Sequence, residues 1–369
     1  MPNVTKNFKT ACFFLFLAAI LLFSLLLSGC SGNSGSEKAE ATTSETVPDT
    51  PESQEYPPES TSVAEEKKKA DSPAPELPFT IEDRMVCMFA DDSWQVPVDF
   101  QGEGESDAAL AGLTWTSDSP RVVSVDDRGN ITAHTEGYAV ISCSNSLSED
   151  KICINVYREL GGGSCWETDM LTAPDELRTY RNYAQGAYDY GDYSEYVAMH
   201  GCAACCTATA LGAWNSEEDW DPEIVVRDLE PEANEKAWKK NYAKTMTKQM
   251  PLTPKGISRV LSLKNIPHTY VPSFDRDTLE EDLRRHLKKG LPVIYQAGNG
   301  GYHMMMLLGL MTDGNVLVSD SVGYYRVRVS SLESVTGQMF SCKEEPNASY
   351  FSGRKTAGGY IKVGEADEE

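Results

Sequence analysis

The sequence predicts a multidomain protein in which an all-β sandwich is followed by an α+β domain. Short segments of alternating apolar and polar residues run from Phe79 to about Tyr157, bounded by Asp, Gly, Ser and Asn, and this pattern is typical of antiparallel sandwiches. From about Ser164 to Val363 helical and strand periods are mixed, which indicates an α+β domain. We expect a signal at 1–29, a stalk at 30–78, the sandwich at 79–158 and the α+β domain at 164–365.

The N-terminus has the pattern of a secretory signal. Lys6 and Lys9 precede an apolar run from Ala11 to Leu27, which is followed by Ser28-Gly29-Cys30. A charged start and an apolar middle are the marks of a signal peptide. Leu27 to Cys30 resembles the bacterial lipobox, which implies cleavage before Cys30 and lipidation of its thiol. We therefore expect an exported, lipid-anchored membrane protein; an uncleaved anchor helix is the alternative.

A polar stalk is expected after Cys30. The stretch from Ser31 to Leu77 is mainly Ser, Thr, Glu, Pro, Lys and Gly, with Tyr56 as its only aromatic residue. Such a composition cannot bury enough apolar surface to fold. The stalk would lift the domains that follow away from the membrane.

Charge and cysteine content narrow the function classes. The chain has 56 acidic and 33 basic residues and a net charge of −23, whereas nucleic-acid binders show clustered Lys and Arg. Nucleic acid is therefore not an expected partner. Ten cysteines at irregular spacing do not make a disulfide scaffold, although export permits disulfides.

Three consecutive motifs of the predicted sandwich carry a family resemblance. Leu113 to Pro120, Val123 to Ala133 and Gly137 to Ile141 closely resemble the group 2 bacterial immunoglobulin-like domain. The resemblance implies that Trp115 is a core residue and that Asp127 to Asn130 is a turn between two strands. Fold-level analogy favours a spacer, with cell-wall or glycan contact as the alternative.

Alternation within the sandwich strands places Cys87 and Cys153 on the outward side and Cys143 inward, beside Ile141. If the strands that carry Cys87 and Cys153 are neighbours, a disulfide between these two residues is geometrically feasible. Connectivity cannot be read from sequence.

The α+β segment contains five elements that can be placed from their periodicity. Two are helices and three are strands, the last two of which flank an Asp313-Gly314 turn. They are the helices Cys202 to Trp214 and Leu279 to Lys289, and the strands Leu291 to Gln296, His303 to Met311 and Val316 to Asp320.

Three residues in this layout have the chemistry of a nucleophilic hydrolase. Cys202 follows Gly201 at the start of a helix, where free N–H groups and the helix dipole stabilise a thiolate. His303 heads a strand and could act as the base, and Asp320 ends the next strand and could orient the imidazole. The order Cys202, His303, Asp320 is that of the papain-like superfamily.

Four local sequences add a more specific resemblance. They resemble, in order, the blocks of cysteine peptidase family thirty-nine, the double-glycine leader peptidases and their stand-alone relatives. This resemblance implies a papain-like fold, Cys202 as nucleophile, His303 as general base, Asp320 as orienting residue, a peptide or protein substrate, and no cofactor. The blocks are Gly201 to Leu211, Gly290 to Ile294, Gly301 to Gly309 and Val316 to Asp320.

The family also uses a Gln upstream of the Cys to help form the oxyanion hole. Six residues before Cys202, where papain-like enzymes often keep this Gln, the chain has Tyr196. Gln185, in Tyr183-Ala-Gln185-Gly, matches the Tyr-x-Gln segment of stand-alone relatives. It is our candidate donor to a developing oxyanion.

Other interpretations of the same residues remain open. Cys202 could be a small buried hydrophobe, His303 a core histidine, and Asp320 the cap of a turn. His200, Cys202, Cys205 and Cys206, completed by Cys165 or Cys342, could form a zinc site, but core packing is the simpler explanation and no metal is expected. A two-residue turn at Asp313-Gly314 would place roughly residue 324 opposite His303, so the triad requires a longer loop or a bulge near Gly309 to Thr312.

The sequence therefore predicts a membrane-anchored extracytoplasmic cysteine hydrolase. We expect it to be a peptidase with a Cys202-His303-Asp320 triad. Peptidoglycan hydrolases of the NlpC type typically have Asp-Cys-Ser or Asp-Cys-Gly at the nucleophile, whereas this chain has His200-Gly201-Cys202. The alternative from another class is a non-catalytic surface binding or adhesion lipoprotein with a degenerate papain-like domain.

Overall fold

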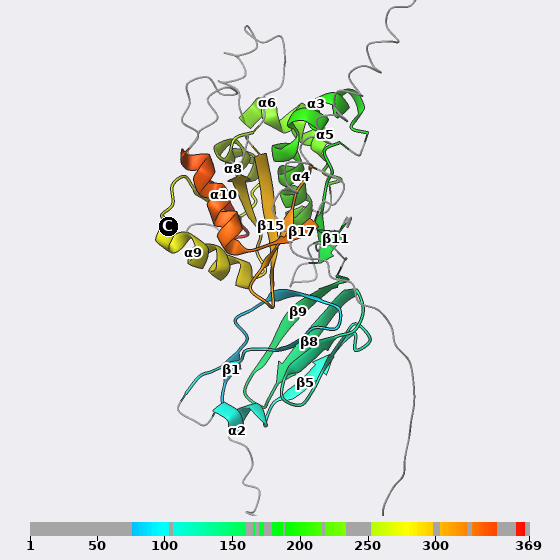
Figure 1. Ribbon diagram of the computed structural model, residues 1–369, viewed down its shortest axis with the longest axis vertical. Coiled ribbons are helices and arrows are strands. Elements are labelled where there is room, and N and C mark those ends of the chain that lie inside the picture. The colour runs from blue at the N-terminus through cyan, green and yellow to red at the C-terminus, as the bar shows by residue number, and fades with distance from the viewer. Residues whose placement is uncertain are drawn as a thin grey trace, which may run out of the picture. The chain divides into compact units, whose positions relative to one another are not determined.

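The protein is described here by a computed structural model (Figure 1). The signal peptide, Cys30 and nearly all of the predicted stalk lie outside the described residues. The residues that the structure describes belong to one compact unit of the chain. The structure describes residues 76–102, 106–159, 165–166, 170–172, 179–186, 189–215, 218–233, 252–297, 303–322, 327–344 and 359–365.

Multiple β-sheets build the N-terminal part, as the alternating pattern predicts. The long strands β8 and β9 form an antiparallel hairpin that pairs Gly137 with Val156 and Ser144 with Glu149. The elements are β1 (Phe79–Thr80), β2 (Met85–Phe89), β3 (Ser93–Gln95), β4 (Asp99–Phe100), α2 (Ser106–Leu110), β5 (Thr114–Ser117), β6 (Val123–Val125), β7 (Asn130–Ala133), β8 (Gly137–Ser144) and β9 (Glu149–Tyr157).

The predicted turn between β6 and β7 is present, and its sequence explains it. The carboxylate of Asp126 accepts hydrogen bonds from the backbone N–H groups of Arg128 and Asn130, both at 2.9 Å. Gly129 has a φ of +77°, which disfavours residues with a Cβ. A Cβ at this position would also lie 2.5 Å from the indole of Trp115. The Trp115 side chain is partly buried and packs against the core from its margin.

The disulfide between Cys87 and Cys153, which the sequence made feasible, is not formed, because both thiols are free. The strands β2 and β9 are neighbours, but they are parallel and their register pairs Met85 with Cys153 and Cys87 with Asn155. The two cysteines are therefore offset by two residues along the sheet. Both side chains point away from the core of the β part, as expected, and yet both are buried in the large cluster that continues into the α+β part.

The β part and the α+β part share one sheet. Strand β2 pairs in parallel with β15 (His303–Met311), matching Val86 with Leu310 and Cys87 with Met311. Gly309 permits this approach, since a Cβ there would lie 2.7 Å from the Sγ of Cys87. The N-terminal part therefore packs directly on the strand that begins at His303.

The α+β part contains every element predicted from the sequence, and several more. The helix at Cys202–Trp214 and the strand at His303–Met311 have the predicted bounds. The elements are β10 (Cys165–Trp166), β11 (Met170–Thr172), β12 (Thr179–Arg181), η1 (Gly191–Tyr193), α3 (Ser194–His200), α4 (Cys202–Trp214), α5 (Pro222–Ile224), η2 (Val225–Leu229), α6 (Glu230–Ala233), α8 (Pro254–Leu263), β13 (His268–Val271), α9 (Arg276–Lys288), β14 (Val293–Ala297), β15, β16 (Val316–Ser319), β17 (Val327–Ser330), α10 (Leu332–Glu344) and β18 (Tyr360–Val363).

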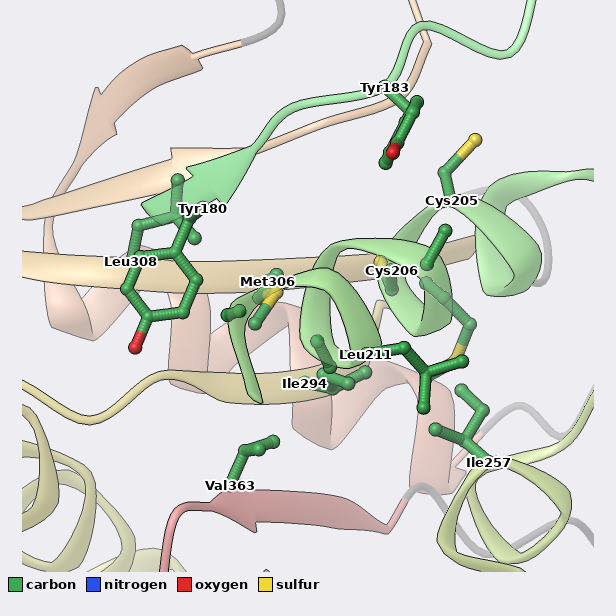
Figure 2. Close-up of a cluster of buried hydrophobic side chains, with 14 of the residues drawn as sticks. Tyr180, Tyr183, Cys205, Cys206, Leu211, Ile257, Ile294, Met306, Leu308 and Val363 are labelled. Carbon is green, nitrogen blue, oxygen red and sulfur yellow. The ribbon is translucent and has the colours of Figure 1, made fainter. Parts of the chain in front are cut away.

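Helices cover both faces of the strands β14, β15 and β16. One face packs on α4 and α8, and the other packs on α9 and α10. Side chains of β15 alternate between these layers, so that Met304 and Met306 join the α4 side while Met305 and Leu307 join the opposite side. Figure 2 shows Met306 and Leu211 among the buried side chains of the α4 layer.

Helix α4 is a core helix. Eleven of its 13 residues are buried, which is the expected fate of a helix that is apolar on all faces. In the part of the chain that the structure describes, no single helix is long and apolar enough to cross a membrane. The pair Gly191–His200 and Cys202–Trp214 passes that test of length and composition jointly but is bent by 111°.

Candidate active site

Cys202 is the first residue of α4, and Gly201 makes this placement possible. Helix α3 closes with a hydrogen bond from Gly201 N–H to Val197 O at 2.8 Å, and α4 opens with one from Cys205 N–H to Gly201 O at 2.8 Å. A Cβ at position 201 would lie 2.4 Å from Val197 O. The backbone therefore passes from one helix to the next within a single glycine, and Cys202 lies beside the N–H groups of the first turn of α4.

His303 and Asp320 are joined by a direct hydrogen bond. The imidazole Nε2 of His303 lies 2.7 Å from Asp320 Oδ1. Asp320 Oδ1 also accepts from the N–H of Val322 at 3.0 Å, and Oδ2 lies 3.0 Å from the Arg328 guanidinium. Burial raises the pKa of Asp320, but the His303 and Arg328 contacts outweigh it and leave the pKa below its usual value. Asp320 is thus held as a carboxylate that faces the imidazole.

The Cys202 thiol is close enough to the same imidazole to raise its pKa. Burial lowers the pKa of His303, but its interactions with Asp320 and Cys202 outweigh burial and raise the pKa to about 10. The imidazole is therefore easily protonated while it remains between a thiol and a carboxylate. The three predicted site residues converge, although Cys202 precedes His303 by 101 residues along the chain.

A bulge in β15 brings Asp320 within reach of His303. The register pairs Leu307 with Val318 but Gly309 with Leu317, so one extra residue is inserted between Leu307 and Gly309. The turn is also longer than two residues, because Met311 N–H bonds to Asn315 O at 2.7 Å. The sequence required a longer loop or a bulge, and the structure has both.

Gln185 lies in the site with both ends of its amide engaged. Its Nε2 donates to Ala198 O at 2.9 Å, and its Oε1 accepts from Ser321 Oγ at 2.9 Å. Its backbone N–H donates to Ser321 O at 2.9 Å. Gln185 therefore ties α3 to the residue after Asp320. A primary amide has two N–H donors, and for one of them the structure gives no hydrogen-bond partner among the described residues.

Cys205 and Cys206 are buried in the α4 layer (Figure 2). Burial raises the pKa of each thiol well above its ordinary value, and the proximity of Cys202 adds to the effect. Neither thiol has the helix-terminal position of Cys202. Among the described residues, no three His, Cys, Asp or Glu side chains are grouped as metal ligands would be.

Sequence reasoning missed two residues of this region. Arg328 on β17 pairs with Asp320, but nothing in Val327–Ser330 distinguishes a functional arginine from a surface one. Glu230 on α6 is fully buried, and its Oε2 accepts a hydrogen bond from Tyr196 Oη at 3.1 Å. The sequence marks Tyr196 only as the residue in the position of the papain-like Gln. No local pattern predicts its contact with Glu230.

The α+β part of the chain is similar to a known protein family. Residues 179–336 match the Peptidase_C39 like family. The Peptidase_C39-like segment includes Gln185, Cys202, His303 and Asp320, and the match supports a papain-like peptidase domain. No curated protein matches the chain.

Two solved structures share short stretches with the chain. One is a GH10 xylanase from termite gut that contains a bacterial Ig-like domain, with 19% identity and a TM-score of 0.16 over 20% of this chain and 18% of that protein. The other is the S-layer protein rSbsC, with 18% identity and a TM-score of 0.18 over 27% of this chain and 15% of that protein. Likenesses of this extent say nothing of what the chain does.

Proposed function

We propose that this protein is a membrane-anchored, extracytoplasmic cysteine peptidase that acts through Cys202, His303 and Asp320. The observation that carries the proposal is the imidazole of His303, which hydrogen-bonds to Asp320 at 2.7 Å and has its pKa raised by the neighbouring thiol of Cys202. The match of residues 179–336 to the Peptidase_C39 like family supports the same chemistry.

The reaction would proceed by acyl transfer. His303 takes the proton of Cys202, and the thiolate attacks the substrate carbonyl carbon to form a tetrahedral oxyanion. The oxyanion collapses to a thioester as the imidazolium gives its proton to the departing amine. Water, deprotonated by His303, then attacks the thioester and regenerates the thiol. Asp320 holds the imidazole in the required orientation and stabilises its protonated form.

The oxyanion would be stabilised by two donors. The backbone N–H of Cys202 lies in the first turn of α4 and has no intrahelical partner. The free N–H of the Gln185 amide is the second donor, on a side chain fixed by Ala198 and Ser321. A rigid donor contributes more than a mobile one, because no reorganisation is needed when the charge develops.

The N-terminal segments would place this site outside the cell. Cleavage before Cys30 and lipidation of its thiol would anchor the chain, and residues 31–77 would form the stalk. The β-rich part at 79–158 would be a group 2 bacterial immunoglobulin-like spacer, with cell-wall or glycan contact as the alternative. The pairing of β2 with β15 supports a spacer fixed to the peptidase.

A non-catalytic surface binding protein is the second candidate. The observation in its favour is the burial of Cys202, whose exposed fraction is 6%. A thiol-directed peptide probe separates the two candidates. We expect the wild type to be labelled at Cys202 and to cleave a peptide library, and Cys202→Ala to do neither. Cys206→Ala, in the same helix, is the matched control that keeps both activities. Absence of labelling and cleavage in the wild type would favour the binding protein.

A further inference from the structure

Glu230 is a buried carboxyl group that the proposed chemistry does not use. It is the first residue of α6, its exposed fraction is 0%, and it follows the wide turn η2, where the Glu230 N–H bonds to Val225 O. A hydrogen bond that spans five residues is the mark of a π-turn, a feature that costs stability and often occurs at functional sites. The turn aims the Glu230 side chain into the core that also contains Cys202.

The carboxyl group has one polar partner. Tyr196 Oη donates to Oε2 at 3.1 Å, whereas Oε1 is buried with no hydrogen-bond partner among the described residues. A carboxylate without a cation is very costly to bury. Burial without a cationic partner among the described residues favours the neutral carboxylic acid, with Oε2 as the acceptor for Tyr196.

Tyr196 connects this acid to the nucleophile. It lies on α3, the helix that ends one residue before Gly201, and its ring centroid is 5.5 Å from that of His200. Tyr196 occupies the position, six residues before Cys202, at which papain-like enzymes often keep a glutamine. The hydroxyl of Tyr196 is directed to Glu230, so the tyrosine fixes α3 against α6.

We propose that Glu230, as an uncharged acid, is a positioning residue that anchors Tyr196 and thereby the turn from His200 to Cys202. This inference rests on the proposed peptidase function and deepens it. Burial raises the pKa of Glu230 well above its ordinary value, the Tyr196 hydrogen bond lowers it, and the proximity of Cys202 raises it further.

Among the residues that the structure describes, the other ionisable groups around α6 do not neutralise Glu230. Arg259 on α8 donates to the carbonyl of Ala233, and Arg227 on η2 pairs with Asp228 and Glu223. Burial lowers the pKa of His200 on α3, so it is no cationic partner near neutral pH. The remaining ionisable side chains on the adjoining elements are Glu195, Cys202, Cys205, Cys206, Glu232 and Lys255.

Four variants test the inference. Glu230→Gln keeps an acceptor for Tyr196 without a charge, and Glu230→Met removes the acceptor. Tyr196→Phe removes the donor, and the double variant, Glu230→Met with Tyr196→Phe, removes both. We expect Glu230→Gln to keep the Cys202 alkylation rate and kcat/KM within about 3-fold of wild type. Glu230→Met and Tyr196→Phe should each lower both by about 10-fold, and the double variant should lose no more than either alone. Controls are Glu232→Gln, exposed on the same helix, and Tyr193→Phe.

The pH profile supplies a readout that mere structural support would not move. Because a neutral Glu230 does not titrate near its ordinary pKa, the profiles of wild type and Glu230→Gln should coincide between about pH 4 and 8. Two results would show that Glu230 acts as a charged carboxylate and would overturn the inference. One is an equal loss of alkylation rate and kcat/KM in Glu230→Gln and Glu230→Met. The other is a pH profile whose acid limb is abolished by Glu230→Gln. Additive losses, or none in Tyr196→Phe, would overturn it as well.

The alkylation arm separates this inference from the proposed function. Cys202 labelling requires no substrate turnover, and folding of each variant is checked by circular dichroism. If the wild type cleaves no peptide but labelling follows the expected order of variants, Glu230 positions the nucleophile and the peptidase assignment fails. If the wild type cleaves peptides and the variants are indistinguishable from it, the assignment stands and the inference fails.

Discussion

His303 Nε2 and Asp320 Oδ1 lie 2.7 Å apart although the strand register does not place these two residues opposite each other. The register pairs Met306 with Ser319, and its continuation would place Val322 opposite His303. Asp320 therefore reaches the imidazole diagonally. Its second oxygen is held by Arg328 at 3.0 Å, which directs the carboxylate toward His303.

The Arg328 contact predicts a graded effect of substitutions at this carboxylate. We expect Asp320→Asn to lower kcat by about 10- to 10⁴-fold, because the neutral amide stabilises an imidazolium poorly. Arg328→Met should have a smaller effect, about 3- to 10-fold, since it leaves the His303 contact intact. Steady-state peptide hydrolysis measures both. An Arg328→Met protein as impaired as Asp320→Asn would mean that the arginine itself contacts the reacting groups.

Stability should depend on pH through His303. Its folded pKa of about 10 exceeds the unfolded value, so its contribution is fully present below an unfolded pKa of about 6.5 and is lost as pH rises toward 10. We expect the wild type to exceed His303→Gln in unfolding free energy by about 2 kcal/mol near pH 6. The difference should shrink as pH rises from 7 to 10, as measured by urea unfolding. A constant difference would contradict the raised pKa.

The contribution of Asp320 to stability depends on pH in the opposite direction, because its folded pKa is lowered. Its contribution is present above the unfolded pKa of about 3.9 and is lost as pH falls through the folded value. We expect the stability difference between wild type and Asp320→Asn to disappear in acid while it persists at neutral pH. Urea unfolding of both proteins at stepped acid pH values measures this, and a difference that grows in acid would reverse the assignment.

The contact between the β part and β15 predicts a steric effect at Gly309. Gly309→Ala would place its methyl group 2.7 Å from Cys87 Sγ and 3.2 Å from Met85 Cε. We expect a loss of about 1 to 3 kcal/mol in unfolding free energy, as overpacking of a core typically costs. Cys87→Ala should restore part of this loss. The control is Gly212→Ala on α4, where the added Cβ meets nothing within 4 Å and alanine favours the helix.

Processing at the N-terminus remains to be tested in cells. We expect Cys30→Ala, or globomycin-type inhibition of the lipoprotein signal peptidase, to change processing of the chain, and Cys30→Ala to release it from the membrane fraction. The reason is the lipobox-like Leu27 to Cys30. Immunoblots of membrane and soluble fractions measure this. A Cys30→Ala protein that stays in the membrane would favour an uncleaved anchor helix.

The sequence was most informative where one short motif determines the local structure. The helix at Cys202–Trp214 follows from its apolar run and Gly201, and the strand at His303–Met311 follows from its length and composition. Tertiary contacts are harder to read. Cys87 points away from the core of the β part as predicted, but that face is buried in the cluster that continues into the α+β part, which no local pattern reveals.

The site was predictable to the same extent. The order of motifs identified Cys202, His303 and Asp320, and the turn length at Asp313-Gly314 indicated that a bulge was needed. The partners of these residues were not predictable, because Arg328 and Glu230 contribute through contacts between distant segments. A buried acid has no periodicity of its own.

The reactivity of the three α4 cysteines is the sharpest test of the proposed enzyme. Cys202 has the helix-terminal position and the His303 contact, whereas burial raises the pKa of Cys205 and Cys206. We therefore expect Cys202 to be alkylated fastest near neutral pH, because the thiolate is the reactive form. Mass spectrometry after digestion assigns each site.

Two substitutions then connect this reactivity to the triad. His303→Ala should slow Cys202 labelling by about 10-fold or more near pH 7, because the thiol loses its proton acceptor. Asp320→Asn should slow it less, since only the orientation and stabilisation of the imidazole are lost. Cys205 and Cys206 should label slowly in all three proteins. Equal reactivity of the three cysteines, unchanged by His303→Ala, would rule out the enzyme and leave the surface binding protein, since a nucleophile that its histidine does not activate cannot perform acyl transfer.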